Sequence, residues 1–159
     1  MPRRGRQSLA DERVFFVTTT TKEHRHLFDS HEKLAGLKNI ISGVARNHDA
    51  KLYGYVLMSN HFHLLVRLEG GGPELSAFMR DVKSLCWKEL FPEHKGIWQA
   101  RFDDVAVRTE KQFRVKLSYI HNNPVKVGLT NKPESYPFSS ASAWLVGVVD
   151  DELPVVTDV

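Results

Sequence analysis

Two histidines separated by one residue lie in the apolar stretch NHFHLLV, residues 60–66. Side chains alternate between the two faces of a β-strand, so His61 and His63 share one face. Two imidazoles on one face either bind a common ligand or find hydrogen-bond partners in a core. The sequence leaves both interpretations open, but ring nitrogens aimed at one point favour the ligand pair.

A histidine pair is an incomplete metal site, and the rest of the sequence restricts the metal. Zinc usually takes three or four nitrogen or sulfur ligands. Cys86 falls in an apolar helical pattern and His94 in a loop, so neither completes a zinc site. A metal held by two imidazoles and one side-chain amide oxygen would keep coordination positions open for phosphate oxygens and water. That arrangement indicates Mg²⁺ or Mn²⁺.

A second group of chemically useful residues lies on a helix expected over 110–122. Its core stripe consists of apolar residues at helical spacing, Phe113, Leu117 and Ile120. A separate face gathers polar side chains, Gln112, Lys116, Tyr119 and Asn123. Residues four apart on a helix are neighbours, so the Asn123 amide lies beside the Tyr119 phenol. A tyrosine on a polar face is commonly only a surface residue, but an amide one turn on and a lysine one turn back favour a functional role.

The elements that must position these residues can be read from the sequence pattern. Strands are expected where β-branched and aromatic residues gather: 13–21, 51–58, 60–68 and a short one near Val105 and Val107. Helices are expected after Asp29 or Ser30, from about Glu74, and over 110–122, where Pro124 ends the last one. The remainder is expected to be irregular. The order βαββαβ-α predicts an α+β fold, a ferredoxin-like antiparallel sheet with helices packed on it, the last helix carrying the tyrosine.

The composition bounds the kind of protein. A chain of 159 residues with 42% hydrophobic residues can form one domain with a substantial core. We expect a basic arm over 1–12, the main domain over 13–145 and an irregular tail over 146–159. Apolar runs fall short of the roughly 20 residues of a membrane span, so no membrane partner is expected. The single cysteine and the lack of an apolar segment behind the basic start favour a cytoplasmic protein.

Positive charge is concentrated in a few segments, although the formal net charge is only +3. A basic arm together with a basic helix is typical of proteins that contact a phosphate backbone. In the second helix a lysine and a tryptophan one turn apart offer a cation and a stacking surface for single-stranded bases. A solvated helix face is the alternative there. The predicted DNA-binding residues are Arg3, Arg4, Arg6, Arg80, Lys83, Trp87, Arg101, Arg108 and Lys116.

Four blocks of the sequence carry a resemblance to a known family. They are GYVLMSNHFHLLV (54–66), IWQARF (97–102), YIHNNPVKVGL (119–129) and YPFSS (136–140). In this order they resemble the signature blocks of REP-associated tyrosine transposases, which belong to the HUH single-tyrosine, IS200-like family. The abbreviation HUH denotes a histidine, a hydrophobic residue and a histidine, as in His61, Phe62 and His63.

The resemblance implies a role for each chemical group. Tyr119 would be the nucleophile, and His61, His63 and Asn123 would bind the metal. The implied reaction is metal-dependent cleavage and rejoining of single-stranded DNA through a 5′-phosphotyrosine intermediate. The implied partner is single-stranded DNA with imperfect hairpins, bound by a monomer or homodimer in the cytoplasm and associated with the nucleoid.

Other functions stay open at this point. A hairpin-binding protein on the same scaffold would bind DNA without cleaving it, although the histidine pair, the tyrosine and the asparagine are all present. A relaxase or replication initiator shares the histidine pair and the tyrosine nucleophile but would require a further domain. A small zinc hydrolase would retain zinc tightly.

Overall fold

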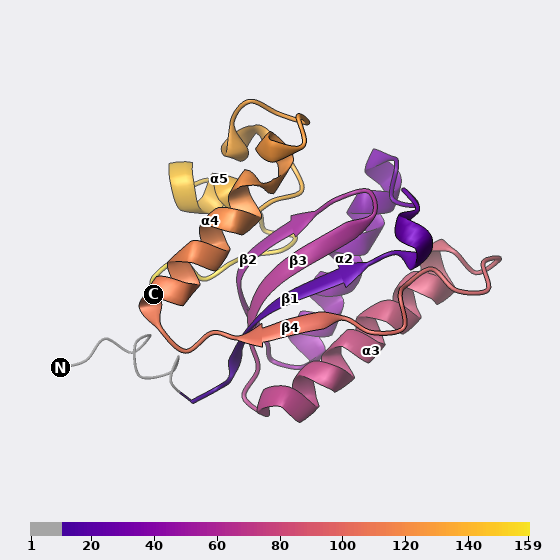
Figure 1. Cartoon of the computed structure of the whole chain (residues 1–159), viewed down its shortest axis with the longest axis horizontal. Helices are drawn as coiled ribbons and strands as arrows, with labels where there is room; N and C mark the ends of the chain where they lie inside the picture. Colours follow the sequence, from indigo (N-terminus) through magenta and orange to yellow (C-terminus); the bar gives the residue numbers. More distant parts are fainter. Residues whose placement is uncertain (1–10) are drawn as a thin grey trace.

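The structure is a computed structural model that describes residues 11–159 (Figure 1). Within that range the strands are β1 (Val14–Thr20), β2 (Lys51–Leu57), β3 (His61–Arg67) and β4 (Asp103–Ala106). The helices are α2 (His31–Asn47), α3 (Gly71–Leu90), α4 (Glu110–Lys126) and α5 (Ala141–Val146), with 3₁₀ turns η1 (Lys22–His24) and η2 (Pro133–Ser135). The strands form one sheet in the order β2-β3-β1-β4, and every neighbouring pair is antiparallel. The predicted α+β, ferredoxin-like fold is confirmed.

The sheet is buried on both faces because its strands carry apolar residues at consecutive positions. Phe62, Leu64 and Val66 face the core formed with α2 and α3, which lie on one side of the sheet. Phe16 and Leu65 face the second core, formed with α4 on the other side. In Figure 1, α2 runs behind the strands. The histidine-bearing face of β3 is therefore the face that α4 covers.

A glycine lets α4 approach the sheet closely. A Cβ placed on Gly54 would lie 2.7 Å from Leu117 Cδ1 of α4. The register of the β2–β3 pair shifts between Leu52 and Gly54, which marks a β-bulge. At the bulge, Tyr53 and Gly54 both lie on the face of the sheet that α4 covers. The glycine thus fixes the distance between α4 and the strands that position the histidines.

The expectation that α4 ends before Pro124 was wrong, because the helix continues to Lys126. A proline removes one backbone donor, here the group that would bond the Ile120 carbonyl, but its fixed φ is compatible with a helix. Pro124 is buried near the end of α4, where Val127 N donates to Asn123 O and closes the last turn. Packing of the buried ring offsets the missing bond. As a result Asn123 is helical and keeps its place one turn after Tyr119.

Two other boundaries differ from the sequence prediction. Helix α3 begins at Gly71, where φ is +66°, rather than at about Glu74, and the Glu74 carboxylate accepts a hydrogen bond from Gly70 N. The Glu74 side chain therefore satisfies a backbone donor at the start of the helix. An apolar pattern in the sequence does not predict such a contact, so it placed the helix start too late. The remainder after α4, expected to be irregular, contains α5, which ends at Gly147 in the left-handed conformation.

The segment between η2 and α5 covers the outer edge of β2. Backbone hydrogen bonds join Leu57 N to Phe138 O at 2.8 Å and Ser140 N to Tyr55 O at 3.0 Å. The Trp144 indole donates to Tyr53 O at 2.6 Å. These contacts satisfy groups that an exposed edge strand would leave unpaired. No helix within residues 11–159 combines the length and apolar character needed to cross a membrane.

Candidate active site

The strand register places the two histidines on the α4 side of β3, one of the two central strands of the sheet. His63 of β3 is paired with Thr18 of β1, and His61 is paired with Thr20. The imidazole ring centroids lie 4.9 Å apart, and the His63 side chain is almost fully buried. The two histidines therefore share one face, as the alternation of a strand requires.

Helix α4 carries Tyr119 to the same place. The Tyr119 ring meets the His63 ring edge-on, with centroids 5.3 Å apart. The tyrosine is 48% exposed, so one side of it contacts the site while the other is open to a large substrate. The strand and the helix, far apart in the sequence, thus form one site.

The site rests on Phe16 of β1. Its ring stacks on His63 with centroids 5.3 Å apart and planes 15° apart, and it contacts the Tyr119 ring edge-on at 6.0 Å. The Lys116 ammonium lies 4.7 Å from the centre of the same ring. Phe16 therefore contacts His63 of β3 and both Lys116 and Tyr119 of α4.

Each imidazole is oriented by a hydrogen bond at Nδ1. Asn60 Oδ1 lies 2.7 Å from His61 Nδ1, and because that oxygen can only accept, Nδ1 carries the hydrogen. Thr18 Oγ1 lies 2.8 Å from His63 Nδ1 and can accept in the same way. With Nδ1 as the donor in both contacts, both Nε2 atoms are free to donate a lone pair, which is the arrangement that oriented metal-binding histidines have.

Two polar atoms of the predicted ligand residues are buried without a hydrogen-bond partner among the described residues. They are His63 Nε2 and Asn123 Oδ1. Buried polar atoms are seldom left unpaired, and both of these have a lone pair to donate. Two imidazole nitrogens and an amide oxygen fit a divalent cation that keeps positions open for phosphate and water.

No cluster of three or more histidine, cysteine, aspartate or glutamate side chains suited to a metal occurs within residues 11–159. Among these residues the histidine pair therefore lacks the further histidine, cysteine or carboxylate ligands that a structural zinc centre would take.

Burial keeps the histidines neutral at physiological pH. It lowers the pKa of His63 to about 3, with smaller contributions from the charges of His61 and Lys116. Burial also lowers the pKa of His61, and the nearby His24 and His26 act in the same direction. A neutral imidazole can bind a metal without first losing a proton.

Comparisons with known proteins agree with this geometry. The family model described as "Transposase IS200 like" matches residues 13–123, a range that contains both histidines, Tyr119 and Asn123. The chain belongs to the IS200-like transposase family. The resemblance inferred from the four sequence blocks is thereby confirmed.

Individual IS200-like relatives are similar over much of the chain. A REP-associated tyrosine transposase of Escherichia coli K12 is 28% identical over 126 residues, which cover 79% of this chain and 74% of that protein. A putative REP-associated tyrosine transposase of Haemophilus influenzae is 28% identical over 96 residues, 53% of this chain and 54% of that protein.

The fold also matches solved structures. A REP-associated tyrosine transposase bound to a REP hairpin has a TM-score of 0.74 at 24% identity, covering 92% of this chain and 87% of that one. A putative transposase from Deinococcus radiodurans has a TM-score of 0.52 at 19% identity, covering 69% and 88%.

The predicted DNA-binding residues of this transposase are not all gathered at the site. Arg80, Lys83 and Trp87 belong to α3, on the opposite side of the sheet from α4. The Lys83 ammonium donates to Gln99 O at 3.1 Å, and the Trp87 indole donates to His94 O at 2.6 Å while its ring stays 43% exposed. Lys83 is thus tied to its own chain, and burial lowers its pKa.

The remaining predicted cations have three different locations. Arg108 follows β4 at the far end of the sheet and pairs with Glu12 at 2.9 Å. Arg101 is exposed in the segment before β4, and Lys116 lies at the site itself. The arm residues Arg3, Arg4 and Arg6 lie outside the described residues. A role in DNA binding stays a prediction for all of these residues.

Three residues of the site were missed by reading the sequence, Phe16, Thr18 and Asn60. Phe16 and Thr18 come from β1, and only the β1–β3 register reveals that they contact His63. The sequence could have indicated Asn60, because a polar residue directly before a ligand histidine can form a hydrogen bond with its ring. The register of two strands that are not consecutive in the sequence is fixed by the whole fold, so no local pattern could have indicated Phe16 and Thr18.

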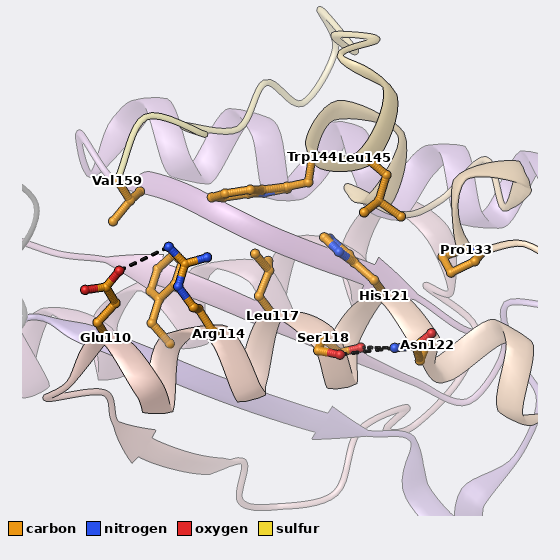
Figure 2. Close-up of a pocket in the computed structure, with 11 residues that line it drawn as sticks. Glu110, Arg114, Leu117, Ser118, His121, Asn122, Pro133, Trp144, Leu145 and Val159 are labelled. Carbon is orange, nitrogen blue, oxygen red and sulfur yellow. Dashed lines mark hydrogen bonds and ion pairs between the residues drawn. The ribbon is translucent and has the colours of Figure 1, made fainter.

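An apolar cavity of about 380 Å³ lies on the other flank of α4 (Figure 2). Leu117 and His121 of α4 and Trp144 and Leu145 of α5 are among its lining residues. Tyr119 is not among them, and its direction on the helix points away from this cavity. The candidate active site is therefore the open surface around Tyr119 and His63.

Proposed function

We propose that this IS200-like transposase cleaves and rejoins single-stranded DNA through a covalent 5′-phosphotyrosine at Tyr119. The observation that carries the proposal is the contact between the Tyr119 and His63 rings, whose centroids are 5.3 Å apart. His63 Nε2, and Asn123 Oδ1 one helical turn after Tyr119, are buried lone-pair donors without a partner among residues 11–159. These observations support a single site that would combine a nucleophile with an oriented donor set.

The residues divide the chemistry between them. Tyr119 Oη attacks a backbone phosphorus, an O–P bond forms, and the bond from phosphorus to the 3′ oxygen breaks. The phenol loses its proton to solvent and the departing 3′ oxygen gains one, so the products are a phosphotyrosine and a free 3′-hydroxyl. The covalent intermediate conserves the phosphodiester bond, so a 3′-hydroxyl can attack it to rejoin DNA without ATP.

The donor atoms fit Mg²⁺ or Mn²⁺, which His61 Nε2, His63 Nε2 and Asn123 Oδ1 would hold. When bound, such an ion supplies Lewis-acid stabilisation of negative charge on a non-bridging phosphate oxygen. The Lys116 ammonium, placed over Phe16 one turn before Tyr119, adds positive charge beside the same phosphate.

The substrate we propose is single-stranded DNA that forms imperfect hairpins. The support is the name of the E. coli relative and the REP hairpin bound in the structure with a TM-score of 0.74. A protein that binds hairpins without cleaving them is the alternative. The experiment below separates the two functions.

The test uses hairpin DNA from repeats flanking the gene, labelled at each end and incubated with protein and Mn²⁺. We expect the wild-type protein to form a covalent adduct that survives denaturing electrophoresis and carries the 5′ phosphate of the cleaved strand. Tyr119→Phe should form no adduct and still bind the hairpin. The control is Tyr53→Phe, a buried tyrosine of β2 that packs on Phe113 away from the site and should leave the adduct intact. An adduct in the Tyr119→Phe protein would contradict the assignment, and binding without any cleavage by the wild type would favour the alternative.

A further inference from the structure

A short basic turn follows β1 at the end of the sheet where His61 lies. It covers residues 22–26, Lys-Glu-His-Arg-His, and every side chain in it is exposed. Lys22 and Arg25 carry positive charge. Glu23 is the single acidic residue. We refer to this segment as the 22–26 turn.

The turn is held against the histidine strand by backbone hydrogen bonds. Thr21 N donates to Asn60 O and Phe28 N donates to Ser59 O, each at 2.9 Å. The His26 ring adds a hydrogen bond between Nδ1 and Ser59 Oγ at 2.5 Å. Asn60 is the residue that orients His61, so the turn is fixed directly beside the proposed metal site.

The other side of the turn is held by the segment that leads to β4. Lys22 N donates to Ile97 O at 2.9 Å. The Arg25 guanidinium contacts Lys22 O and Gly96 O, each at 3.4 Å. These contacts limit the directions that the guanidinium can take. Its planar fork of five N–H donors can engage a phosphate through donors that these two contacts do not use.

The backbone of the turn is unusual. Glu23 and His24 have φ values of +60° and +55°, so two consecutive residues other than glycine adopt the left-handed conformation. Such a conformation is unfavourable for L-residues and concentrates at functional sites. It reverses the chain at once after β1 and leaves the side chains of the turn exposed.

We infer that the 22–26 turn binds backbone phosphates of the single-stranded segment next to the cleaved bond, with Arg25 and Lys22 as the main contacts. The inference rests on the proposed function, because the cleaved phosphate defines where the adjacent strand runs. A strand with its scissile phosphate at Tyr119 and His61 must leave the site across a neighbouring surface. This turn presents cations on that surface, whereas the predicted cations of α3 lie across the sheet.

The test compares the double variant Lys22→Ala/Arg25→Ala with the matched double variant Arg46→Ala/Lys88→Ala. The control also removes one exposed arginine and one exposed lysine, from α2 and α3 on the other side of the sheet. Both doubles are made in the Tyr119→Phe protein for binding and in the wild-type protein for cleavage. Two DNAs are used, a hairpin with a single-stranded flank that spans the cleavage position and the same hairpin without the flank.

We expect the turn variant to bind the flanked hairpin at least tenfold more weakly than the control. Its binding should depend less on salt, with the logarithmic slope reduced by about 0.7 for each phosphate that the variant no longer neutralises. Binding of the hairpin without the flank should not change. Circular dichroism melting should show both variants folded, since the substituted side chains are exposed.

Equal binding of the flanked DNA by the turn variant and the control would overturn the inference. An equal reduction in affinity for both DNAs would also overturn it, because the turn would then contact the hairpin rather than the flank. Failure of the proposed function gives a different result, the absence of any adduct in the wild-type protein. The binding measurements still decide the inference in that case.

Discussion

The ring of Phe16 lies against the ring of His63, with centroids 5.3 Å apart and planes 15° apart. The same phenyl ring contacts Tyr119 edge-on and lies beneath the Lys116 ammonium. Phe16 is nearly buried, on β1 between the histidine strand and β4. One aromatic side chain thus sets the position of the proposed nucleophile relative to the proposed metal ligands.

Replacing Phe16 by leucine should therefore impair catalysis more than folding. We expect Phe16→Leu to lower the rate of adduct formation about tenfold, because a displacement of the reacting groups is costly in rate. The free energy of unfolding should fall by about 1 kcal/mol, as for other apolar exchanges of similar volume. Single-turnover cleavage and urea unfolding measure the two effects. Phe15→Leu is the matched control, since Phe15 is equally buried on the other face of β1. A similar reduction in rate in both variants would show that general loosening of β1, rather than contact with His63, is responsible.

The Thr18 hydroxyl should contribute to metal affinity through His63. Thr18→Val keeps the side-chain shape and removes the oxygen that lies 2.8 Å from His63 Nδ1. Removal of such an orienting partner commonly weakens metal binding roughly 10–100-fold. Calorimetric titration with Mn²⁺ measures the change.

Thr19→Val provides the control for Thr18→Val. Thr19 Oγ1 is buried without a hydrogen-bond partner among the described residues, on the opposite face of β1. Its removal should leave Mn²⁺ affinity unchanged and raise the free energy of unfolding by about 1 kcal/mol, because burying an unpaired hydroxyl is unfavourable. Equal Mn²⁺ affinity in the Thr18→Val and wild-type proteins would contradict an orienting role for Thr18.

Much of the fold follows from local patterns in the sequence. Apolar residues at strand and helix spacing were sufficient to predict the order βαββαβ-α and the shared face of His61 and His63. The end of α4 was not predictable in this way. A proline usually stops a helix, but burial of Pro124 depends on packing that the local sequence does not describe.

The candidate site could be predicted only in part, for a related reason. Tyr119 and Asn123 were visible as neighbours on one helix face, and the histidines as neighbours on one strand. Their meeting depends on the register of β1 with β3 and on the approach of α4 at Gly54. The contact of Lys83 was equally hidden, because only the fold brings its ammonium to the Gln99 carbonyl.

The close approach of α4 at Gly54 can be tested with a single methyl group. Gly54→Ala places Cβ about 2.7 Å from Leu117 Cδ1, so α4 must shift. We expect the free energy of unfolding to fall by roughly 1–3 kcal/mol, as for other overpacked cores, and adduct formation to slow because Tyr119 moves with the helix. Gly43→Ala in α2 is the control, because its Cβ would lie 4.0 Å from the Arg46 side chain. That variant should be more stable by about 0.5–1 kcal/mol, since alanine is the better helix former. Equal stability of the Gly54→Ala and wild-type proteins would show that α4 does not depend on this contact.

A pH-dependent contact joins α2 to α3 far from the active site. His48 Nε2 lies 2.8 Å from Asp81 Oδ2, and Nδ1 lies 3.3 Å from Glu74 Oε2. The hydrogen bond to Asp81 is the main reason that the pKa of His48 is raised above 6.5, with Glu74 adding to it and burial opposing it. Because the folded state holds the proton more tightly than the unfolded state, this contribution is complete below about pH 6.5. It disappears as the pH rises through the raised pKa of the folded protein.

We therefore expect His48→Gln to remove a stabilisation of about 0.5–1 kcal/mol at about pH 5.5 and to have a smaller effect at about pH 8.5. Urea unfolding at a series of pH values measures the difference between the variant and the wild type. Asp81→Asn should reduce the same pH dependence while retaining the histidine, so it separates the ion pair from the packing of the His48 ring on Phe78. A difference between His48→Gln and wild type that stays constant across this pH range would assign the role of His48 to packing alone.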